Sequence, residues 1–339
     1  MCRNNKEIIT EKSDACDWGL CVFFSVDLEG ATAYKVETRT QKGDEDWCAV
    51  FERFYVDFPE QFLSIYKPID VEGVADATRP SLWKFVGDEI LFFSPLTDSR
   101  HTLEHLNAFS NAITKYNSKL EDSHVNVRCK GTAWIAGFPV NNRIVLIPGF
   151  GDADARNIDF IGSSIDCGFR LTKFSSSRRL VVSLDLLWMF VASYKACSKN
   201  TLAYKGITFR YYGEHVLKGV FSGKAYPVFW LDLASGEDII EDEWLPSPVV
   251  CKHDDIVKFC EKVVGRMKKS DFIRPFIIDD TARLFDKMPD GFKEQREALP
   301  AYKKEGNKNI PSNAERQVVK DVELPTNVLS PQGMINKIS

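Results

Sequence analysis

The sequence of 339 residues lacks two kinds of apolar segment. Its most apolar stretch, residues 180 to 192, is interrupted by Ser183 and Asp185 and is shorter than the roughly 20 residues that cross a membrane. The N-terminus is polar, without the apolar stretch of a secretion signal. We therefore expect a cytoplasmic protein with no membrane partner, and we interpret residues 180 to 192 as core.

Excess basic charge and paired cysteines are also missing. A net charge of -4 provides no broad positive field for a nucleic acid, so we expect nucleotides as small substrates and no nucleic-acid partner. The cysteines number nine, and none of them forms a C-x-x-C pair. Such an odd, scattered set is typical of reduced thiols inside the cell.

Two aspartates, Asp27 and Asp88, each lie at a turn next to hydrophobic, strand-like residues. Residues 21 to 26 predict a buried strand that brings Asp27 to a turn, and residues 31 to 38 predict the helix that follows. Residues 83 to 93 predict a β-hairpin with Gly87 and Asp88 at its tip. Carboxylates suit Mg²⁺ or Mn²⁺, and a turn that opens a helix suits phosphate. The pair therefore predicts a metal site beside a bound triphosphate.

The hydrophobic periodicity elsewhere predicts an α+β layer sandwich with a mostly antiparallel sheet. Strands are expected over residues 125 to 138, 144 to 147 and 226 to 233, the last being the final strand of the sheet. An amphipathic helix is expected over residues 103 to 120. An aromatic stripe at helical spacing indicates core packing, with a base pocket or a subunit contact as the alternative: Trp47, Phe51, Phe54, Phe58, Phe62 and Tyr66.

Three ordered segments resemble the motifs of class III nucleotidyl cyclases. Residues 26 to 32, V-D-L-E-G-A-T, resemble F-x-D-I-x-G-F/S-T, and residues 84 to 89, K-F-V-G-D-E, resemble the K/E-x-x-G-D hairpin. Residues 159 to 171 resemble the segment D-x-x-G-x-x-V-N-x-A-x-R-L. A weaker match, V-L-K-G-V at residues 216 to 220, resembles the strand that carries the triphosphate-binding lysine.

The resemblance implies a ferredoxin-like cyclase sandwich and an enzyme of the phosphorus-oxygen lyase class. Two ions of Mn²⁺ or Mg²⁺ per site would be bridged by Asp27 and Asp88, with the backbone carbonyl of Leu28 as a further ligand. Arg170 would stabilise charge on the α-phosphate, which makes it catalytic together with the two aspartates. The implied substrate-binding residues are Lys84, Asp159, Asp166, Lys218, Gly30 and Thr32.

The same resemblance implies a homodimer. The family forms its site between two cyclase domains, and this chain has one copy of each motif, so two equivalent sites would lie at a two-fold interface. Our interpretation places two sets of residues opposite one another there: Asp27, Lys84 and Asp88 against Asp159, Asp166, Arg170 and Lys218.

The substrate follows from departures within these motifs. Lys84 is at the base-selecting position and resembles adenylate cyclases, yet Asp166 stands where the family usually has Asn, and Ala31 where it has Phe or Ser. The combination is most similar to bacterial pyrimidine cyclases of the Pycsar antiphage system. Their cyclic UMP or cyclic CMP activates an effector that halts the infected cell.

An ammonium at Lys84 favours the position-4 oxygen of uracil over the amine of cytosine, although it could instead contact the position-2 oxygen that both bases share. We therefore expect UTP as substrate, with CTP and then ATP as alternatives. A non-catalytic, cyclase-like binding module is the rival of another class. The doubled glycine of diguanylate cyclases is absent around Asp88.

Four regions are expected along the chain. Residues 1 to 18 form a flexible N-terminus, and residues 19 to 235 form the cyclase domain. Residues 236 to 302 form a helical extension, with helices over residues 254 to 268 and 279 to 287. Residues 303 to 339 form a mobile polar tail. The glycine-rich stretch at residues 148 to 154 is interpreted as a flexible connection.

Overall fold

The structure, a computed structural model, describes residues 19–42, 45–66, 77–148, 156–197, 207–233, 249–267 and 272–298. Contacts divide the chain into residues 1–296 and 297–339, and the elements named below belong to the first unit. The expectations for residues 1 to 18, for most of the glycine-rich connection and for the polar tail lie outside the described residues.

An eight-stranded sheet with the order β10-β8-β9-β7-β4-β1-β3-β2 is the central element. Its neighbouring strands are antiparallel, except for the parallel pair β4 and β7. This confirms the predicted α+β fold with a mostly antiparallel sheet. The strands are β1 (Leu20–Glu29), β2 (Ser81–Val86), β3 (Glu89–Leu96), β4 (Arg128–Gly137), β7 (Arg179–Val182), β8 (Phe209–Val216), β9 (Ala225–Asp232) and β10 (Val249–Val250).

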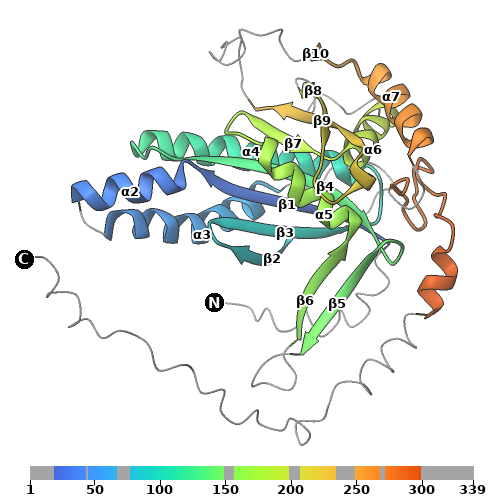
Figure 1. The fold of residues 1–339 in the computed structure, drawn as a ribbon, viewed down its shortest axis with the longest axis horizontal. Coiled ribbons are helices and arrows are strands. Elements are labelled where there is room, and N and C mark those ends of the chain that lie inside the picture. Colours follow the sequence, from blue (N-terminus) through green and yellow to red (C-terminus); the bar gives the residue numbers. More distant parts are fainter. Residues whose placement is uncertain are drawn as a thin grey trace, which may run out of the picture. The chain divides into compact units, whose positions relative to one another are not determined.

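The helices and a small second sheet surround this central sheet (Figure 1). β5 (Asn142–Pro148) and β6 (Arg156–Gly162) form an antiparallel pair that runs away from the main sheet next to α5. The helices labelled in Figure 1 are α2 (Ala31–Lys42), α3 (Glu45–Ile65), α4 (His101–Asp122), α5 (Ser163–Leu171), α6 (Leu184–Ala196) and α7 (His253–Arg266).

The two faces of the main sheet contribute to different cores, because side chains alternate along each strand. From β1, Val22 and Phe24 join the large core with α3, α4 and α6. Cys21 and Phe23 join a smaller cluster with Trp134 of β4. By this alternation, Asp27 lies on the face of the smaller cluster, where α5 covers β4.

The aromatic stripe packs in the large core, as predicted. Phe54, Phe58 and Phe62 of α3 are fully buried, and the Phe58 ring lies 5.6 Å from the ring of Tyr116 on α4. Burying each such ring contributes about 1.5–3 kcal/mol of transfer free energy. The stripe therefore fixes α3 against the sheet. The apolar residues 180 to 192 are likewise core, within β7 and α6.

Part of the chain after β9 belongs to the same core. Ile256 and Cys260 of α7 and Ile277 further along are buried in the large cluster. Phe276 lies so close to Gly137 that a Cβ there would be 2.5 Å from its ring. Among the described residues, no helix is long and apolar enough to cross a membrane.

Two expectations for the C-terminal part of the sequence are wrong. The helix expected over residues 279 to 287 does not form, because Asp279 (φ 59°) and Arg283 (φ 52°) have left-handed backbone conformations. The Asp280 carboxylate there accepts the backbone N–H groups of Leu284 and Phe285. β9 is also not the last strand of the sheet, since β10 follows it in the sequence and pairs with β8.

Candidate active site

Asp27 lies near the end of β1, directly opposite Lys130 in the pairing of β1 with β4. The Lys130 Nζ is 3.1 Å from the Asp27 Oδ2, and the two side chains are 24% and 30% exposed. The backbone N–H of Leu28 donates to the other oxygen, Oδ1, at 2.9 Å. Both carboxylate oxygens of Asp27 therefore have a partner within the chain.

Asp88 is at the tip of the β2–β3 hairpin, as predicted, with Gly87 in a left-handed conformation (φ 63°). Tyr55 of α3 donates its hydroxyl to the Gly87 carbonyl. Its ring meets the ring of Phe85 edge to face at 5.2 Å. Because these contacts join the tip to α3, they fix where the Asp88 carboxylate can lie.

The two predicted metal ligands, Asp27 and Asp88, interact electrostatically. Burial raises the pKa of Asp27, Lys130 lowers it, and the charge of Asp88 raises it. Burial also raises the pKa of Glu89, whose carboxylate accepts the hydroxyl of Ser25, and the charges of Asp27 and Asp88 raise it further. Three carboxylates thus repel one another around this point, and a cation would relieve that repulsion.

The donor set fits a hard divalent cation of the Mg²⁺ or Mn²⁺ type. The described residues contain no group of three or more His, Cys, Asp or Glu side chains that could hold a metal ion. The available donors are instead two carboxylates, Asp27 and Asp88, together with the carbonyl of Leu28. The ammonium of Lys130, already paired with Asp27, shows that this carboxylate accepts a positive partner.

The turn after Asp27 is arranged as the sequence predicts. Gly30 has a left-handed conformation (φ 83°), and its carbonyl accepts the N–H of Tyr34 in the first turn of α2. Thr32 is exposed in that turn, which contains no acidic residue. The first N–H groups of a helix have no partner within it, and the helix dipole favours an anion there.

Lys84 and Asp159 form an ion pair within one chain, with the Nζ 2.8 Å from Oδ1. The Lys84 ammonium also lies 4.4 Å from the centre of the Trp83 ring, and that ring packs against Phe160. Our sequence interpretation placed Lys84 and Asp159 on opposite subunits. The structure differs because β6 brings Asp159 next to β2, so the two residues belong to one set.

α5 carries Asp166 and Arg170 one turn apart, and both side chains are exposed. The Arg170 Nε donates to the carbonyl of Lys218 at 3.0 Å. On the inner side of α5, a Cβ on Gly168 would lie 2.2 Å from the ring of Trp134. A glycine is therefore required for α5 to lie this close to β4.

Lys218 is exposed in a turn rather than within a strand, which corrects the strand that the motif resemblance implies for residues 216 to 220. β8 ends at Val216, Leu217 is buried, and Gly219 (φ 79°) reverses the chain before β9. The structure therefore brings Lys218 to Arg170 through a turn.

The candidate residues fall into two groups. Asp27, Leu28, Gly30, Thr32 and Asp88 gather at the end of β1 and at the hairpin tip. The second group has two parts, the Lys84–Asp159 pair and the residues around α5, which are Asp166, Arg170 and Lys218. Within the described part of the chain, no hydrogen bond or ion pair joins the first group to the second.

Sequence reasoning missed Lys130, Tyr55 and the part played by Glu89. Lys130 meets Asp27 only through the register of β1 with β4, and no local pattern predicts a pairing over that distance in sequence. Tyr55 lies off the core-facing stripe of α3. Glu89 follows Asp88 in the hairpin motif, and that position was the available indication.

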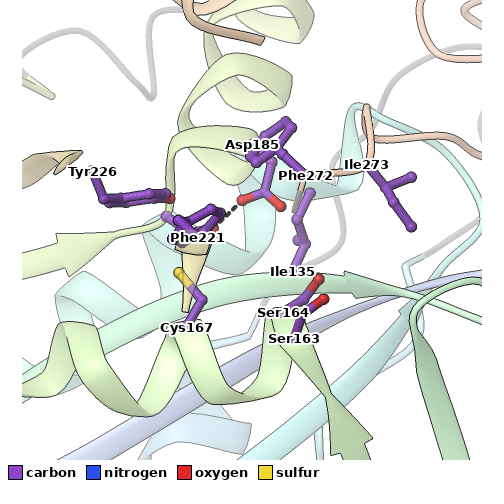
Figure 2. A pocket seen from close by; sticks show the side chains of 10 residues that line it. Ile135, Ser163, Ser164, Cys167, Asp185, Phe221, Tyr226, Phe272 and Ile273 are labelled. Atoms are coloured by element: carbon purple, nitrogen blue, oxygen red, sulfur yellow. Dashed lines mark hydrogen bonds between the residues drawn. The ribbon is translucent and has the colours of Figure 1, made fainter. Parts of the chain in front are cut away.

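A small pocket lies on the inner side of α5 and contains none of the predicted residues (Figure 2). Asp185 faces it from the start of α6, and Cys167 faces it from α5. Burial raises the pKa of Asp185 to about 6, although hydrogen bonds from the Ser183 hydroxyl and the Leu186 N–H oppose the shift.

Comparison with known proteins gives matches among solved structures. The adenylyl cyclase CyaB from P. aeruginosa is 13% identical with a TM-score of 0.46, covering 66% of this chain and 97% of that one. The guanylyl cyclase Cya2 is 14% identical with a TM-score of 0.42, covering 65% and 94%. The guanylate cyclase domain of RhGC from Catenaria anguillulae, in complex with GTP, is 11% identical with a TM-score of 0.42, covering 63% and 96%. No family model and no curated protein matches the chain.

Proposed function

We propose that this chain is a nucleotidyl cyclase that converts UTP to cyclic UMP and diphosphate. The proposal is supported by the electrostatic interaction of Asp27, near the end of β1, with Asp88, in the hairpin turn before β3, which is the strand next to β1. A turn suited to phosphate follows Asp27 directly. Cyclisation of a nucleoside triphosphate needs carboxylates and a phosphate site next to each other.

Asp27, Asp88 and the Leu28 carbonyl are the residues that would hold divalent ions, two of Mn²⁺ or Mg²⁺ per site. When bound, such ions acidify the 3′-hydroxyl and neutralise charge on the triphosphate. The residues of the chain bind and orient the nucleotide. The first turn of α2, with Gly30 and Thr32, receives phosphate through its N–H groups.

Arg170 and Lys218 supply the positive charge for the phosphates. The guanidinium of Arg170 stabilises the charge that develops on the α-phosphate, and the ammonium of Lys218 holds the terminal phosphates. Both side chains are exposed, and the hydrogen bond from the Arg170 Nε to the backbone carbonyl of Lys218 joins α5 to the turn that carries Lys218. Asp166, one turn before Arg170, binds the nucleotide from the same helix.

A second copy of the chain completes each site. The two groups of candidate residues are not joined within one chain, whereas a two-fold dimer can place one group of each subunit against the other group of its partner. Six large apolar side chains are exposed on strands where a partner could cover them. They are Leu82, Phe85 and Val86 on β2, Ile161 on β6, and Tyr212 and Val216 on β8.

The Lys84–Asp159 pair offers the base one donor and one acceptor. Uracil presents O4 as an acceptor for the Lys84 ammonium and N3–H as a donor to the Asp159 carboxylate. Cytosine fits in another register, with its amine on Asp159 and N3 on Lys84, so CTP is the alternative substrate. We prefer UTP because the ammonium of Lys84 donates most directly to the uracil oxygen.

The proposed biological role is a second messenger in antiphage defence of the Pycsar type, with an effector that responds to the cyclic nucleotide. This part rests on the resemblance of the sequence motifs. Nucleotide extracts of cells that express the chain, taken before and after phage infection, should show a rise in cyclic UMP. An unchanged level would contradict the role without contradicting the chemistry.

Product analysis tests the activity itself. The purified protein is incubated with Mn²⁺ and separately with UTP, CTP, ATP and GTP, and products are identified by mass spectrometry. We expect cyclic UMP from UTP. Cyclic CMP or cyclic AMP as the main product would correct the substrate, and the absence of product from all four, with Mn²⁺ bound, would favour a binding module.

A further inference from the structure

The proposed reaction gives no role to the ion pair between Lys130 and Asp27. The two residues are directly paired across β1 and β4, so the sheet itself sets their separation. Both side chains are less than one third exposed. An ion pair in this position is only partly screened by water and is worth more than a surface pair.

Lys130 also compensates the acidic surroundings. Asp27, Asp88 and Glu89 interact electrostatically, and Lys130 opposes the effect of burial at both Asp27 and Glu89. Without a cation there, the carboxylates would be left partly desolvated and mutually repelling. Lys130 therefore reduces the repulsion among these carboxylates when no metal ion is bound.

The ion pair with Lys130 competes with the proposed role of Asp27 as a metal ligand. Oδ2 of Asp27 is occupied by Lys130 and Oδ1 by the N–H of Leu28. A divalent ion that binds Asp27 must approach one of these oxygens, and an ammonium at 3.1 Å repels it. The lysine must be displaced from Oδ2, or it must share the carboxylate at an energetic cost.

We propose that Lys130 is a positioning residue that holds the Asp27 carboxylate in place and competes with the divalent ion for it. The lysine thereby sets the metal concentration at which the site fills. This inference rests on the proposed function, which makes Asp27 a metal ligand.

The test uses Mn²⁺ alone, without nucleotide, on the full chain. Mn²⁺ binding is measured by electron paramagnetic resonance of the free ion, and unfolding is followed in parallel with and without Mn²⁺. We expect Lys130→Met to bind Mn²⁺ about three- to tenfold more tightly than the wild type. Its melting temperature should be lower without metal and should rise more when Mn²⁺ is added.

Two further variants keep the test decisive. Lys130→Arg retains a cation and should remain near the wild-type affinity. The neutral Lys130→Gln replaces Lys130→Met if the methionine variant does not fold, and it should show the same tighter Mn²⁺ binding. Lys119→Met is the matched control, because Lys119 forms an ion pair with Asp57 and is 53% exposed. It removes the same charge from the chain and should leave Mn²⁺ binding unchanged.

The outcomes separate this inference from the function on which it rests. Equal or weaker Mn²⁺ binding by both neutral variants would overturn the competition by Lys130. If Asp27→Ala still abolished Mn²⁺ binding in that case, the metal site would stand and the role of Lys130 alone would fall. If neither the wild type nor any Lys130 variant bound Mn²⁺, the metal site of the proposed function would fall as well.

Discussion

At the scale of single residues, the proposed chemistry depends on a few charged side chains whose surroundings determine their behaviour. Asp27 is half-buried and has partners on both oxygens, while Asp88 is at a tip fixed by Tyr55. The exposed Arg170 is fixed by a single hydrogen bond to the Lys218 carbonyl. The fold therefore constrains the carboxylates of Asp27 and Asp88 more strongly than the guanidinium of Arg170.

Removal of either aspartate tests the metal site. Asp27→Ala and Asp88→Ala should each lower product formation at least about 100-fold, because each removes a ligand whose charge the reaction needs. The circular dichroism spectrum should match that of the wild type. Asp57→Ala, which removes an aspartate from the ion pair with Lys119, serves as the control and should retain full activity. Unchanged turnover in Asp27→Ala under Mn²⁺ would show that the site assignment is wrong.

Arg170 tests the distinction between substrate binding and transition-state stabilisation. Arg170→Ala should lower kcat by about 10²–10³ while changing KM little, since the guanidinium meets a charge that grows during the reaction. Steady-state kinetics with varied triphosphate give both values. An effect on KM alone would make Arg170 a binding residue.

Asp185 predicts a pH dependence of stability. Its folded pKa of about 6 is above the ordinary value of 3.8, so the folded chain holds a proton that the unfolded chain has lost between these values. The free energy of unfolding should therefore fall as the pH rises from about 4 to about 6, by at most about 3 kcal/mol.

Asp185→Asn removes this titration and isolates it from the other acids. The variant should be more stable than the wild type above about pH 6, and the difference between the two should vanish near pH 4. Denaturant unfolding at a series of pH values measures it. A difference that stayed constant over that range would show that Asp185 titrates normally.

At the scale of secondary structure, local sequence patterns predict those elements whose conformation is determined by neighbouring residues. The hairpin tip at Gly87–Asp88 and the apolar stripe of α3 follow from turn chemistry and helical spacing, and both form. The absence of a helix at residues 279 to 287 does not follow, because Asp280 accepts the N–H of the remote Ser99. Contacts between segments that are distant in the sequence therefore determine the conformation of residues 279 to 287.

The candidate site shows the same division. The resemblance of the motifs implied that Asp27 acts with Asp88 and that Arg170 and Lys218 lie on the same side of a dimer interface. The pairing of Lys84 with Asp159, and of Lys130 with Asp27, depends on which strand lies next to which. The sequence alone could not supply that arrangement, since each pair joins segments that fold together only in the finished sheet.

α5 offers a test at this scale, because its position depends on a single glycine. Gly168→Ala would place a Cβ 2.2 Å from Trp134, so α5 must move outward and carry Asp166 and Arg170 with it. We expect a loss of about 1–3 kcal/mol in unfolding free energy and a fall in kcat. Chemical denaturation and kinetics measure the two effects.

Gly265→Ala in α7 is the matched helical control. A Cβ at Gly265 meets nothing within 4 Å, so this variant should be neutral or gain up to about 1 kcal/mol. It should leave the reaction rate unchanged. A Gly168→Ala variant that behaved in the same way would contradict the close packing of α5 on β4.

At the scale of the whole molecule, the account requires two chains. In the proposed dimer, each subunit would contribute the first group of candidate residues to one site and the second group to the other, and the two groups are not joined within the described part of the chain. The exposed apolar side chains on β2, β6 and β8 indicate where a partner would pack. Ile256 and Cys260 of α7, and Ile277 and Phe285 after it, are buried in the same core as α6.

Complementation between two inactive variants tests this central claim most directly. Asp88→Ala lacks one group and Arg170→Ala lacks the other, so each homodimer has two defective sites. A mixed dimer has one site with both substitutions and one with neither. With random exchange of subunits, half of the dimers are mixed, and activity should recover to about a quarter of the wild-type rate.

The measurement is the rate of cyclic UMP formation after the two variants are mixed or co-expressed, compared with each variant alone. Recovery towards a quarter of the wild-type rate would show that two chains share each site and that Asp88 and Arg170 act in the same reaction. A rate no greater than the sum of the separate variants would contradict the shared site.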